Sequence, residues 1–397
     1  MLFLANTIAL IVQGIIGVNL LMPMIFYLAD RVTGKRRPHY PITHPQQDKV
    51  FDYAVIVTAY EETALLPAVV NSLLRLNYNR YIIYVVADNC DVSDLHFNDE
   101  RIVILRPPTV LASNVKSHFY AIENFIRPHD NLTIIDSDNE VVPDYLNELN
   151  VYFNQGFEAV QGPRKAKNLN TTYACLDAAR DIYYHFYDAR ILFNLGSSAT
   201  LAGSGMAFNV DLYKRLLGNY QQKGAGFDKV LQFEIVNDNK RIAYAAKAVV
   251  YDEKTARSEQ LVKQRARWIN TWFKYFYFGF VLLYKAVKHG NRNQFLFGLT
   301  LVRPPLFIFL LLSFLCLLIH VLFGAFLLAG IWLLALLIFV ISFLLALYHS
   351  ETDKRIYAAL TGIPKFIFFQ VKSLFYAKRA NKISVATKHA SQKTDRQ

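Results

Sequence analysis

The stretch Leu132-Thr133-Ile134-Ile135-Asp136-Ser137-Asp138-Asn139-Glu140 decides the fold. The run Leu132 to Ile135 predicts a buried strand, and two aspartates one residue apart follow it at once. Carboxylates that follow a strand lie at the rim of the sheet, where ligands bind. Mg²⁺ and Mn²⁺ prefer such oxygen ligands and share their coordination with substrate phosphates. A plain polar turn is the alternative, because Asp, Ser and Asn favour turns on their own.

The surrounding sequence alternates short apolar runs with amphipathic stretches. Such alternation predicts βαβ units and an α/β fold with a mainly parallel sheet, a Rossmann-like domain over 50–256. The expected strands are Tyr53–Ala59, Tyr81–Ala87, Arg101–Leu105, Leu132–Ile135, Ala159–Gln161, Met206–Asn209 and Ala248–Tyr251, and the expected helices are 64–76, 113–126 and a Tyr- and Phe-rich one over 171–193.

Composition points to a membrane. The chain has 397 residues, 53% of them hydrophobic and 14% aromatic, with a net charge of +12. Ten Lys or Arg residues against three acids lie in 351–397, behind a long apolar region, and that placement is typical of a cytoplasmic flank beside a membrane. Nucleic-acid binding is therefore the weaker reading. Three scattered cysteines predict neither a disulfide framework nor a zinc site.

The first 29 residues carry no Asp, Glu, Lys or Arg and are long enough to span a bilayer. Positive residues follow this run instead of preceding it, which favours an uncleaved anchor over a signal peptide. The usual excess of positive residues on the cytoplasmic side of a membrane then predicts that the N-terminus lies outside and that the chain after Arg31 enters the cytoplasm. Residues 30–49, with three prolines, predict a linker.

The C-terminal part is expected to return to the membrane. Residues 257–295 are basic and aromatic, as in helices that lie in the bilayer interface. Residues 304–350 carry no formally charged side chain, so 296–350 predicts a transmembrane hairpin with its turn near Gly324 to Gly330. The basic tail, 351–397, opens with another interfacial stretch. Together these segments predict a multi-pass protein of the cell membrane with a cytosolic catalytic domain.

Acidic residues follow several of the expected strands: Glu62, Asp88, the pair Asp136 and Asp138, and Asp228. Loops at the strand ends of an open α/β sheet form one crevice, so these side chains are expected to converge. Asp88 is placed to accept from a base N–H or a ribose hydroxyl. An ordinary cap in a βα loop explains Asp88 equally well.

In this order the motifs resemble the family 2 glycosyltransferases with a GT-A domain, in particular membrane-embedded relatives of cellulose, chitin and poly-N-acetylglucosamine synthases. Tyr60-Glu61-Glu62 is similar to a Tyr-Asn-Glu element, with Glu61 in place of Asn. The resemblance implies a donor site of Tyr60, Glu62, Asp88, Lys116 and Asp136, a metal site of Asp136 and Asp138, and an acceptor-side and diphosphate set of Gly203, Ser204, Gly205, Gln264, Arg267 and Trp268.

Two later motifs complete the resemblance. Gly226-Phe227-Asp228-Lys229 is similar to a Glu-Asp element whose Asp is the catalytic base, with Phe227 in place of Glu. Tyr251-Asp252-Glu253-Lys254 precedes a full Gln-x-x-Arg-Trp at Gln264–Trp268, typical of membrane polysaccharide synthases. In the alternative reading Arg267 and Trp268 only anchor an interfacial helix, as Arg265 is expected to do.

The resemblance implies a metal-dependent, inverting hexosyltransferase of polysaccharide biosynthesis that moves a sugar from a nucleoside-diphosphate donor, taken as a UDP-sugar, to a growing polysaccharide or a lipid-linked acceptor. Its cofactor would be Mg²⁺ or Mn²⁺, and it would contact membrane lipid and possible partner membrane subunits, with no nucleic acid. Transfer of a single sugar to a lipid carrier or glycolipid is one alternative. A catalytically inactive membrane scaffold and a nucleotidyltransferase are the others.

Overall fold

A computed structural model describes residues 2–34, 49–220, 224–378 and 380. The chain forms two compact units. The sheet unit comprises the described parts of 39–169 and 198–255, and the helical unit comprises those of 1–38, 170–197 and 256–378. Most of the expected linker, 35–48, and the end of the basic tail, 381–397, lie outside the described residues.

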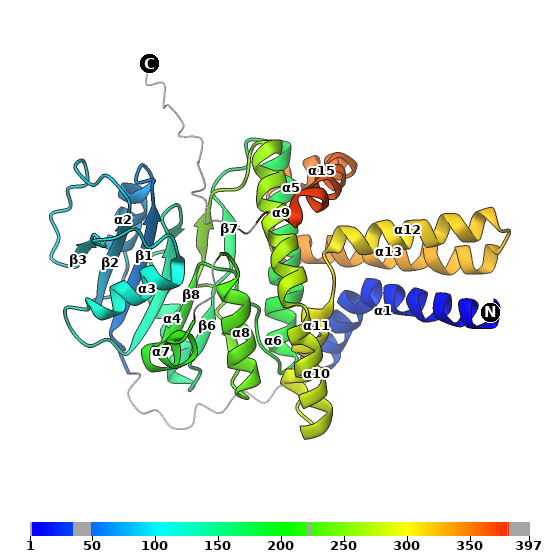
Figure 1. Cartoon of the computed structure of the whole chain (residues 1–397), viewed down its shortest axis with the longest axis horizontal. Coiled ribbons are helices and arrows are strands. Elements are labelled where there is room, and N and C mark those ends of the chain that lie inside the picture. Colours follow the sequence, from blue (N-terminus) through cyan, green and yellow to red (C-terminus); the bar gives the residue numbers. More distant parts are fainter. Residues whose placement is uncertain (1, 35–48, 221–223, 379, 381–397) are drawn as a thin grey trace, which may run out of the picture. The chain divides into compact units, whose positions relative to one another are not determined.

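A seven-stranded sheet in the order β3-β2-β1-β4-β8-β6-β9 forms the centre of the sheet unit (Figure 1). Strands β3, β2, β1 and β4 are parallel, β8 runs antiparallel to both β4 and β6, and β9 is parallel to β6. The expected α/β fold with a mainly parallel sheet is therefore confirmed. The strands are β1 (Tyr53–Tyr60), β2 (Tyr81–Asp88), β3 (Ile102–Leu105), β4 (Asn131–Asp136), β6 (Ala159–Gln161), β8 (Met206–Asn209) and β9 (Ile242–Tyr244).

The central strands are apolar along nearly their whole length because both faces of the sheet are covered. All eight residues of β2, and six of the eight in β1, are buried. Fully covered strands of a parallel sheet are expected to be continuous apolar runs of this kind. The register pairs Tyr60 with Asp88 and Thr58 with Asp136, so β1, β2 and β4 end at the same edge.

A second sheet of three short strands, in the order β5-β10-β7, lies in the same unit. It follows the Asp136–Asp138 turn directly, since β5 (Glu140–Val141) begins two residues after Asp138 and pairs with β10 (Val250–Asp252). Strand β7 (Arg164–Ala166) pairs with β10 in parallel. The helices of the sheet unit are α2 (Leu66–Leu74), α3 (Asn114–Glu123), α4 (Tyr145–Asn154), α7 (Val210–Leu217) and α8 (Phe227–Asn237).

The helical unit is built from segments far apart in the sequence. The expected single helix over 171–193 is interrupted by the π-helix η1, and the basic, aromatic stretch after residue 257 divides into two helices at Phe276. The elements are α1 (Leu2–Gly34), α5 (Thr172–Tyr184), η1 (His185–Ile191), α6 (Leu192–Asn194), α9 (Ser258–Tyr275), α10 (Tyr277–His289), α11 (Arg292–Val302), α12 (Leu306–Leu322), α13 (Phe326–His349), α14 (Lys354–Ala359), η2 (Leu360–Gly362) and α15 (Ile363–Ala377).

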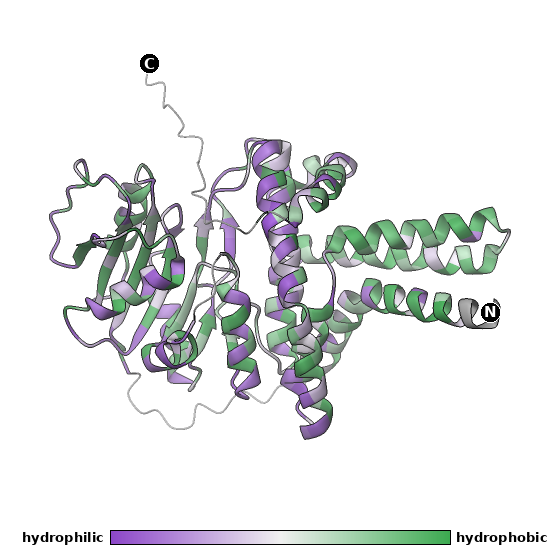
Figure 2. Ribbon diagram, in the orientation of Figure 1, coloured by the Kyte–Doolittle hydropathy of each residue, from purple (hydrophilic) through white to green (hydrophobic). Residues whose placement is uncertain are grey.

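Two helices of this unit are long and apolar enough to cross a membrane, over Thr7–Thr33 and Phe326–His349. The bent pair α11 and α12, with 70° between its halves, makes a third if it counts as one span. Helices α1, α12 and α13 are hydrophobic along most of their length (Figure 2), and their outward side chains are largely exposed Leu, Ile, Val and Phe. Such surfaces fit association with a membrane.

Candidate active site

The ends of β1 and β2 bring three of the predicted donor-site residues together. Because Tyr60 is paired with Asp88, the Tyr60-Glu61-Glu62 segment leaves the sheet beside the Asp88 turn. The Glu61 N–H donates to the Asp88 carbonyl (3.2 Å), and the Asn89 side chain donates to a Glu61 carboxylate oxygen (3.4 Å). Glu62 caps the following turn by accepting from the Ala64 N–H.

Asp88 is buried, with 1% of its surface exposed. Its two carboxylate oxygens accept hydrogen bonds from the backbone of a distant loop, one from the Leu111 N–H (2.9 Å) and the other from the Ala112 N–H (2.7 Å). Hydrogen bonds to an ionised acceptor are about twice as strong as neutral ones. In this structure Asp88 therefore holds the loop before α3, and its predicted contact with a nucleotide stays a prediction.

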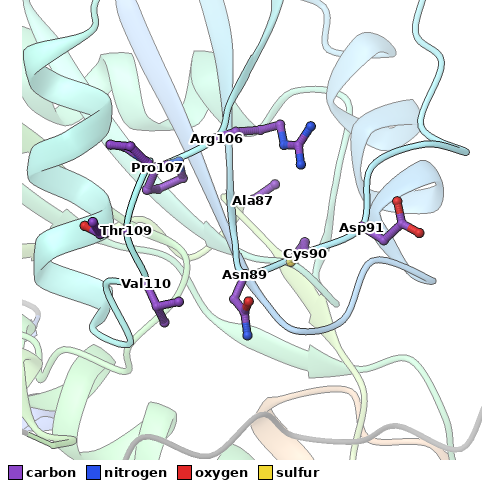
Figure 3. A pocket seen from close by; sticks show the side chains of 9 residues that line it. Ala87, Asn89, Cys90, Asp91, Arg106, Pro107, Thr109 and Val110 are labelled. Carbon is purple, nitrogen blue, oxygen red and sulfur yellow. The ribbon is translucent and has the colours of Figure 1, made fainter.

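The loop that Asp88 holds is one wall of a cavity of about 510 Å³ (Figure 3). Several of the side chains that line it are polar and can form hydrogen bonds with a small polar molecule. Lys116 lies beyond this loop in the first turn of α3 with its side chain exposed, and its N–H donates to the capping hydroxyl of Ser113. The cavity is lined by Ala87, Asn89, Cys90, Asp91, Arg106, Pro107, Pro108, Thr109 and Val110.

The Asp136–Asp138 turn carries the strongest electrostatic perturbation of the site. Burial and the neighbouring charge of Asp138 raise the pKa of Asp136 to about 7, and Asp252 and Asp228 act in the same direction. Only Arg164 opposes them. Four carboxyl groups are therefore close enough for their charges to interact, and they come from three separate parts of the chain, since Asp136 and Asp138 share one turn. A carboxyl group whose pKa is shifted by burial and by neighbouring charges is a marker of functional sites.

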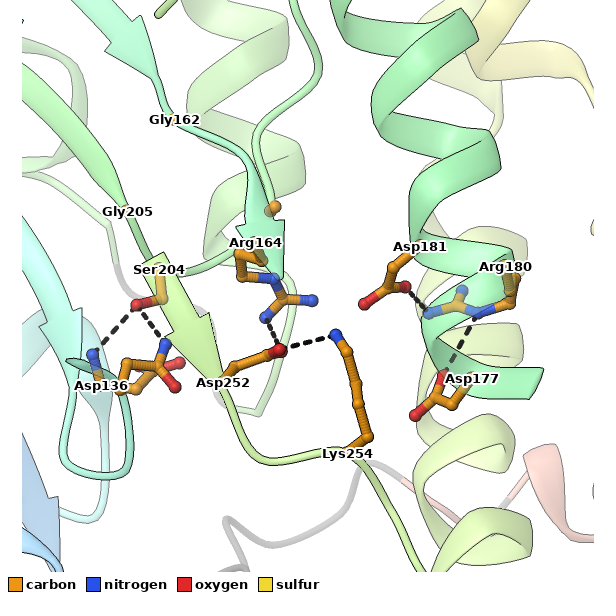
Figure 4. A network of polar contacts seen from close by, with 12 residues as sticks. Asp136, Gly162, Arg164, Asp177, Arg180, Asp181, Ser204, Gly205, Asp252 and Lys254 are labelled. Carbon is orange, nitrogen blue, oxygen red and sulfur yellow. Dashed lines mark hydrogen bonds and ion pairs between the residues drawn. The ribbon is translucent and has the colours of Figure 1, made fainter. Parts of the chain in front are cut away.

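Ser204 fixes the shape of this turn. It is fully buried, and its hydroxyl oxygen accepts from the Asp136 N–H (3.1 Å) and from the Asn139 side chain (2.7 Å), as the contacts beside Asp136 in Figure 4 show. Gly205 has a φ of +67°, and a Cβ there would lie 2.8 Å from the Val250 side chain. Ser204 and Gly205, predicted as acceptor-side residues, therefore hold the backbone of the aspartate turn in place. At Gly203, by contrast, a Cβ would meet no atom within 4 Å.

A buried glutamine that the sequence analysis did not select holds the Ser204 turn from behind. The Gln161 side-chain nitrogen donates to the carbonyls of Ser204 (3.0 Å) and Gly205 (3.2 Å), and its oxygen accepts from the Ala202 N–H (2.9 Å). A fully satisfied buried amide rigidifies the backbone around it. Gln161 is thus a positioning residue for the aspartate turn. Its position in a three-residue strand gave no sequence signal.

Basic side chains also lie behind the turn. Lys254, which is almost fully buried, pairs with Asp252 (2.6 Å), and Arg164 lies 3.7 Å from the same carboxylate (Figure 4). Lys167 pairs with Glu140 (2.7 Å) and donates to the Asp138 carbonyl (3.1 Å). Positive charge therefore surrounds the aspartates on the side of the small sheet. From the sequence, Lys254 was noted only as part of a motif, and neither Arg164 nor Lys167 was predicted to lie here.

Asp228, the predicted base, lies in the first turn of α8. Its charge acts on Asp136, and it forms an ion pair with Lys229 (3.2 Å), whose ammonium also donates to the Leu201 carbonyl. Phe227, which replaces the usual Glu of the motif, is buried with its ring against the buried ring of His118 (centroids 5.3 Å apart). The replacement therefore fills the core and leaves the carboxylate of Asp228 in place.

The acidic pair fits a divalent ion that is completed by substrate oxygens. Among the described residues no three His, Cys, Asp or Glu side chains are gathered as a metal site. Two carboxylates, with the remaining ligands from diphosphate and water, are a donor set that Mg²⁺ and Mn²⁺ accept. The raised pKa of Asp136 indicates excess negative charge at this point, which a bound cation would relieve.

The Gln264–Trp268 motif lies on α9 of the helical unit. Its arginine Arg265, expected to anchor the helix at a membrane interface, lies inside the protein instead. Two guanidiniums contact the ring of Trp268, that of Arg265 at 4.0 Å and that of Arg180 at 4.2 Å from the centroid. Arg265 is buried and pairs with Asp177, so the expectation that it anchors an interfacial helix is wrong. It positions Trp268 instead. Gln264 and Arg267 are partly buried on the same helix.

Residues 51–271 match the sequence model of a family described as glycosyltransferase like family 2. Among solved structures, the chain is similar to the mannosyltransferase PcManGT from Pyrobaculum calidifontis in complex with GDP-Man and Mn²⁺, with 13% identity, a TM-score of 0.49 and coverage of 92% of this chain and 99% of that one. It is also similar to S. aureus TarS 1–349, with 15% identity, a TM-score of 0.38 and coverage of 58% and 65%. A search of curated proteins found no match.

Proposed function

The chain belongs to the glycosyltransferase-like family 2, and from that premise we propose that it is a membrane-bound, inverting transferase that uses a nucleoside-diphosphate sugar. The family match covers more than half of the chain and includes every predicted site residue from Tyr60 to Trp268. The observation that carries the proposal is the grouping of Asp136, Asp138 and Asp228, whose charges interact at the edge of the sheet.

The donor would bind along this edge. Its nucleoside would occupy the cavity whose wall Asp88 holds, with Tyr60 and Glu62 at the ends of the adjoining strand and Lys116 near the phosphates. Asp136 and Asp138 would hold Mg²⁺ or Mn²⁺, which when bound withdraws charge from the diphosphate leaving group. A UDP-sugar is the proposed donor.

Asp228 would act as the general base. The acceptor oxygen forms a bond to the anomeric carbon while the bond from that carbon to the diphosphate oxygen breaks, and Asp228 takes the hydroxyl proton. One displacement of this kind inverts the anomeric centre. The Lys229 ammonium pairs with the Asp228 carboxylate (3.2 Å) and holds it in place. Ser204 and Gln161 keep the aspartate turn rigid during the reaction.

The acceptor is proposed to be a growing polysaccharide or a lipid-linked sugar, and the acceptor role implied for Gly203, Gln264, Arg267 and Trp268 rests on the resemblance of their motifs. The full Gln-x-x-Arg-Trp favours a polymer. Transfer of one sugar to a lipid carrier is the second candidate, because the described residues include only two candidate spans, or three with the bent pair. In both cases the sheet unit would lie in the cytosol, a proposal supported by the basic residues that follow the first span.

Release of nucleoside diphosphate from a panel of UDP- and GDP-sugars, with Mn²⁺ and with chelator, tests the proposal. We expect metal-dependent release with one donor, and product length on a gel separates a polymer from a single addition. Asp228→Asn should retain donor binding and lower transfer about 10³-fold, which is within the usual range for one general base. Asp211→Asn, an exposed acid on α7, is the control. Full activity of Asp228→Asn would remove it as the base.

A further inference from the structure

Three aromatic rings meet where α1 and α13 end. The rings of Tyr27, Phe186 and His349 lie 5.7 to 6.3 Å apart by their centroids, and His349 is parallel to Phe186. The Tyr27 hydroxyl and the His349 Nε2 form a hydrogen bond of 3.0 Å. We call these three residues the ring cluster. It joins the first helix of the chain, the π-helix η1 and the last long apolar helix.

Two exposed arginines lie over the ring cluster. The Arg31 guanidinium is 5.6 Å from the centroid of the Tyr27 ring, and the Arg190 guanidinium is 5.8 Å from that of Phe186. Both positive charges act on His349. Among the residues that the structure describes, neither arginine has an ion pair, since the nearby Asp188 is engaged by Arg303. Positive charge from two exposed side chains is thus gathered beside His349.

The ring cluster lies at the end of the apolar surface. Gln13 accepts a hydrogen bond from the Trp332 indole (3.3 Å), and Tyr27 contacts His349 further along both helices, so α1 and α13 run in the same direction and end together. The intervening surface of both helices is exposed and apolar. A membrane that covers this surface would have its headgroup layer at Arg31 and His349, where lipid phosphate is the abundant anion.

We propose that Arg31, Arg190 and His349 form a binding site for the phosphate of an anionic membrane lipid. A guanidinium group can bind two phosphate oxygens at once through two parallel hydrogen bonds. The aromatic rings beneath Arg31 and Arg190 attract these guanidinium groups and orient them without neutralising their charge. The acyl chains of the lipid would lie along the apolar faces of α1 and α13. This site is separate from sugar transfer and does not depend on the donor or acceptor. Its consequence is a fixed depth for the helical unit in the bilayer.

The test uses the full chain in neutral detergent, titrated with short-chain phosphatidylglycerol, phosphatidylcholine or inorganic phosphate while tryptophan fluorescence is recorded. The double variant Arg31→Gln/Arg190→Gln should bind phosphatidylglycerol about 30-fold more weakly. This fold-change corresponds to the loss of about 1 kcal/mol for each arginine near an anionic headgroup. Phosphatidylcholine binding should stay unchanged. Lysine at both positions should restore part of the preference, which a loss of folding would not do.

Arg355→Gln is the matched control, because this exposed arginine follows α13 closely but is already paired with Asp353 (2.8 Å). It should keep the preference for the anionic lipid. An equal loss in Arg355→Gln, or an undiminished preference in the double variant, would overturn the site. If inorganic phosphate binds as tightly as phosphatidylglycerol, the ligand is a free anion and the assignment to lipid is wrong. Sugar transfer by the double variant should match that of the control.

Discussion

Asp88 and Asp136 end two strands of the same sheet, on either side of β1, yet their surroundings are opposite. The two oxygens of Asp88 accept hydrogen bonds from backbone N–H groups 23 and 24 residues away, and the side chain is buried. At Asp136, burial and the charges of three other carboxylates, Asp138 first among them, raise the pKa to about 7. The first aspartate stabilises the fold, and the second stores unfavourable charge that a cation can relieve.

The comparison shows that position in the sheet does not settle the role of an acidic residue. Both side chains follow apolar runs at a carboxyl edge, where ligands are expected. What separates them is whether donors or acceptors surround the carboxylate. Substitutions that remove charge without changing shape are therefore the best way to test the contrast.

The largest effect is expected at Asp136. Asp136→Asn should lower metal-dependent transfer about 10³-fold or more, because an amide cannot supply the charge that holds the ion and leaving group. The same change should raise the melting temperature of the metal-free protein at pH 8, since it removes a carboxylate that is unfavourable there. Parallel assays of transfer and thermal unfolding, with Asp211→Asn as control, measure both. Unchanged activity would end the metal assignment.

Asp88→Asn should have the opposite effect on stability. The amide keeps one acceptor oxygen but places an NH₂ group against a backbone N–H, at a cost of about 1–3 kcal/mol. The loop from Arg106 to Ala112 should then move and enlarge the cavity, so donor affinity should fall as well. Thermal unfolding and nucleotide titration check this, with the exposed Asp94→Asn as control. If Asp88→Asn instead raised the melting temperature, the conclusion that Asp88 stabilises the fold while Asp136 destabilises it would be wrong.

The pH dependence of metal binding is a smaller, more specific consequence. The metal-free protein holds a proton on Asp136 below a pH of about 7, whereas the ordinary value for this side chain is 3.8. Bound metal must displace this proton, so the dissociation constant for Mn²⁺ should rise about tenfold for each pH unit below 7 and level off above it.

The same raised pKa predicts that the metal-free fold loses stability as the pH rises from about 4 to 7, because the unfolded chain releases its proton at a lower pH than the folded chain. Titration calorimetry at several pH values measures the first effect.

Asp136→Asn is the control for this titration. Its residual metal binding should lose the step near pH 7, because the group that titrates is absent. A constant affinity of the unmodified protein between pH 6 and 8 would contradict the raised pKa.

The long apolar runs of this chain made its sheet predictable, since buried parallel strands leave few other choices for residues such as those of β1 and β2. Strands β5, β7 and β9 have two or three residues each, too few for a periodic pattern, and none was anticipated. The aspartate turn was recognised from spacing and resemblance.

Its supporting residues were not recognised, because each acts through tertiary contacts. Gln161 holds the Ala202–Gly205 segment behind the aspartate turn from 41 to 44 residues away, and the backbone donors that occupy Asp88 come from a loop with no motif of its own. Arg265 was interpreted as an anchor because its partner Asp177 is 88 residues distant in the chain. Local pattern therefore predicted candidate site residues but not the contacts that hold them.

The smallest effect concerns the turns that follow β1 and β2. Glu61 and Asn89 both have left-handed backbones, with φ of 59° and 54°. Asparagine tolerates this conformation better than glutamate, so Glu61→Asn should stabilise the protein by about 0.5 kcal/mol, in a position where its resemblance to the family already places Asn. Asn89→Glu should destabilise it by a similar amount. Equilibrium unfolding by denaturant measures both changes. If Glu61→Asn is destabilising, the bond from the Asn89 side chain to the Glu61 carboxylate (3.4 Å) outweighs the backbone strain, and the two turns are held by that contact instead of by their local conformations.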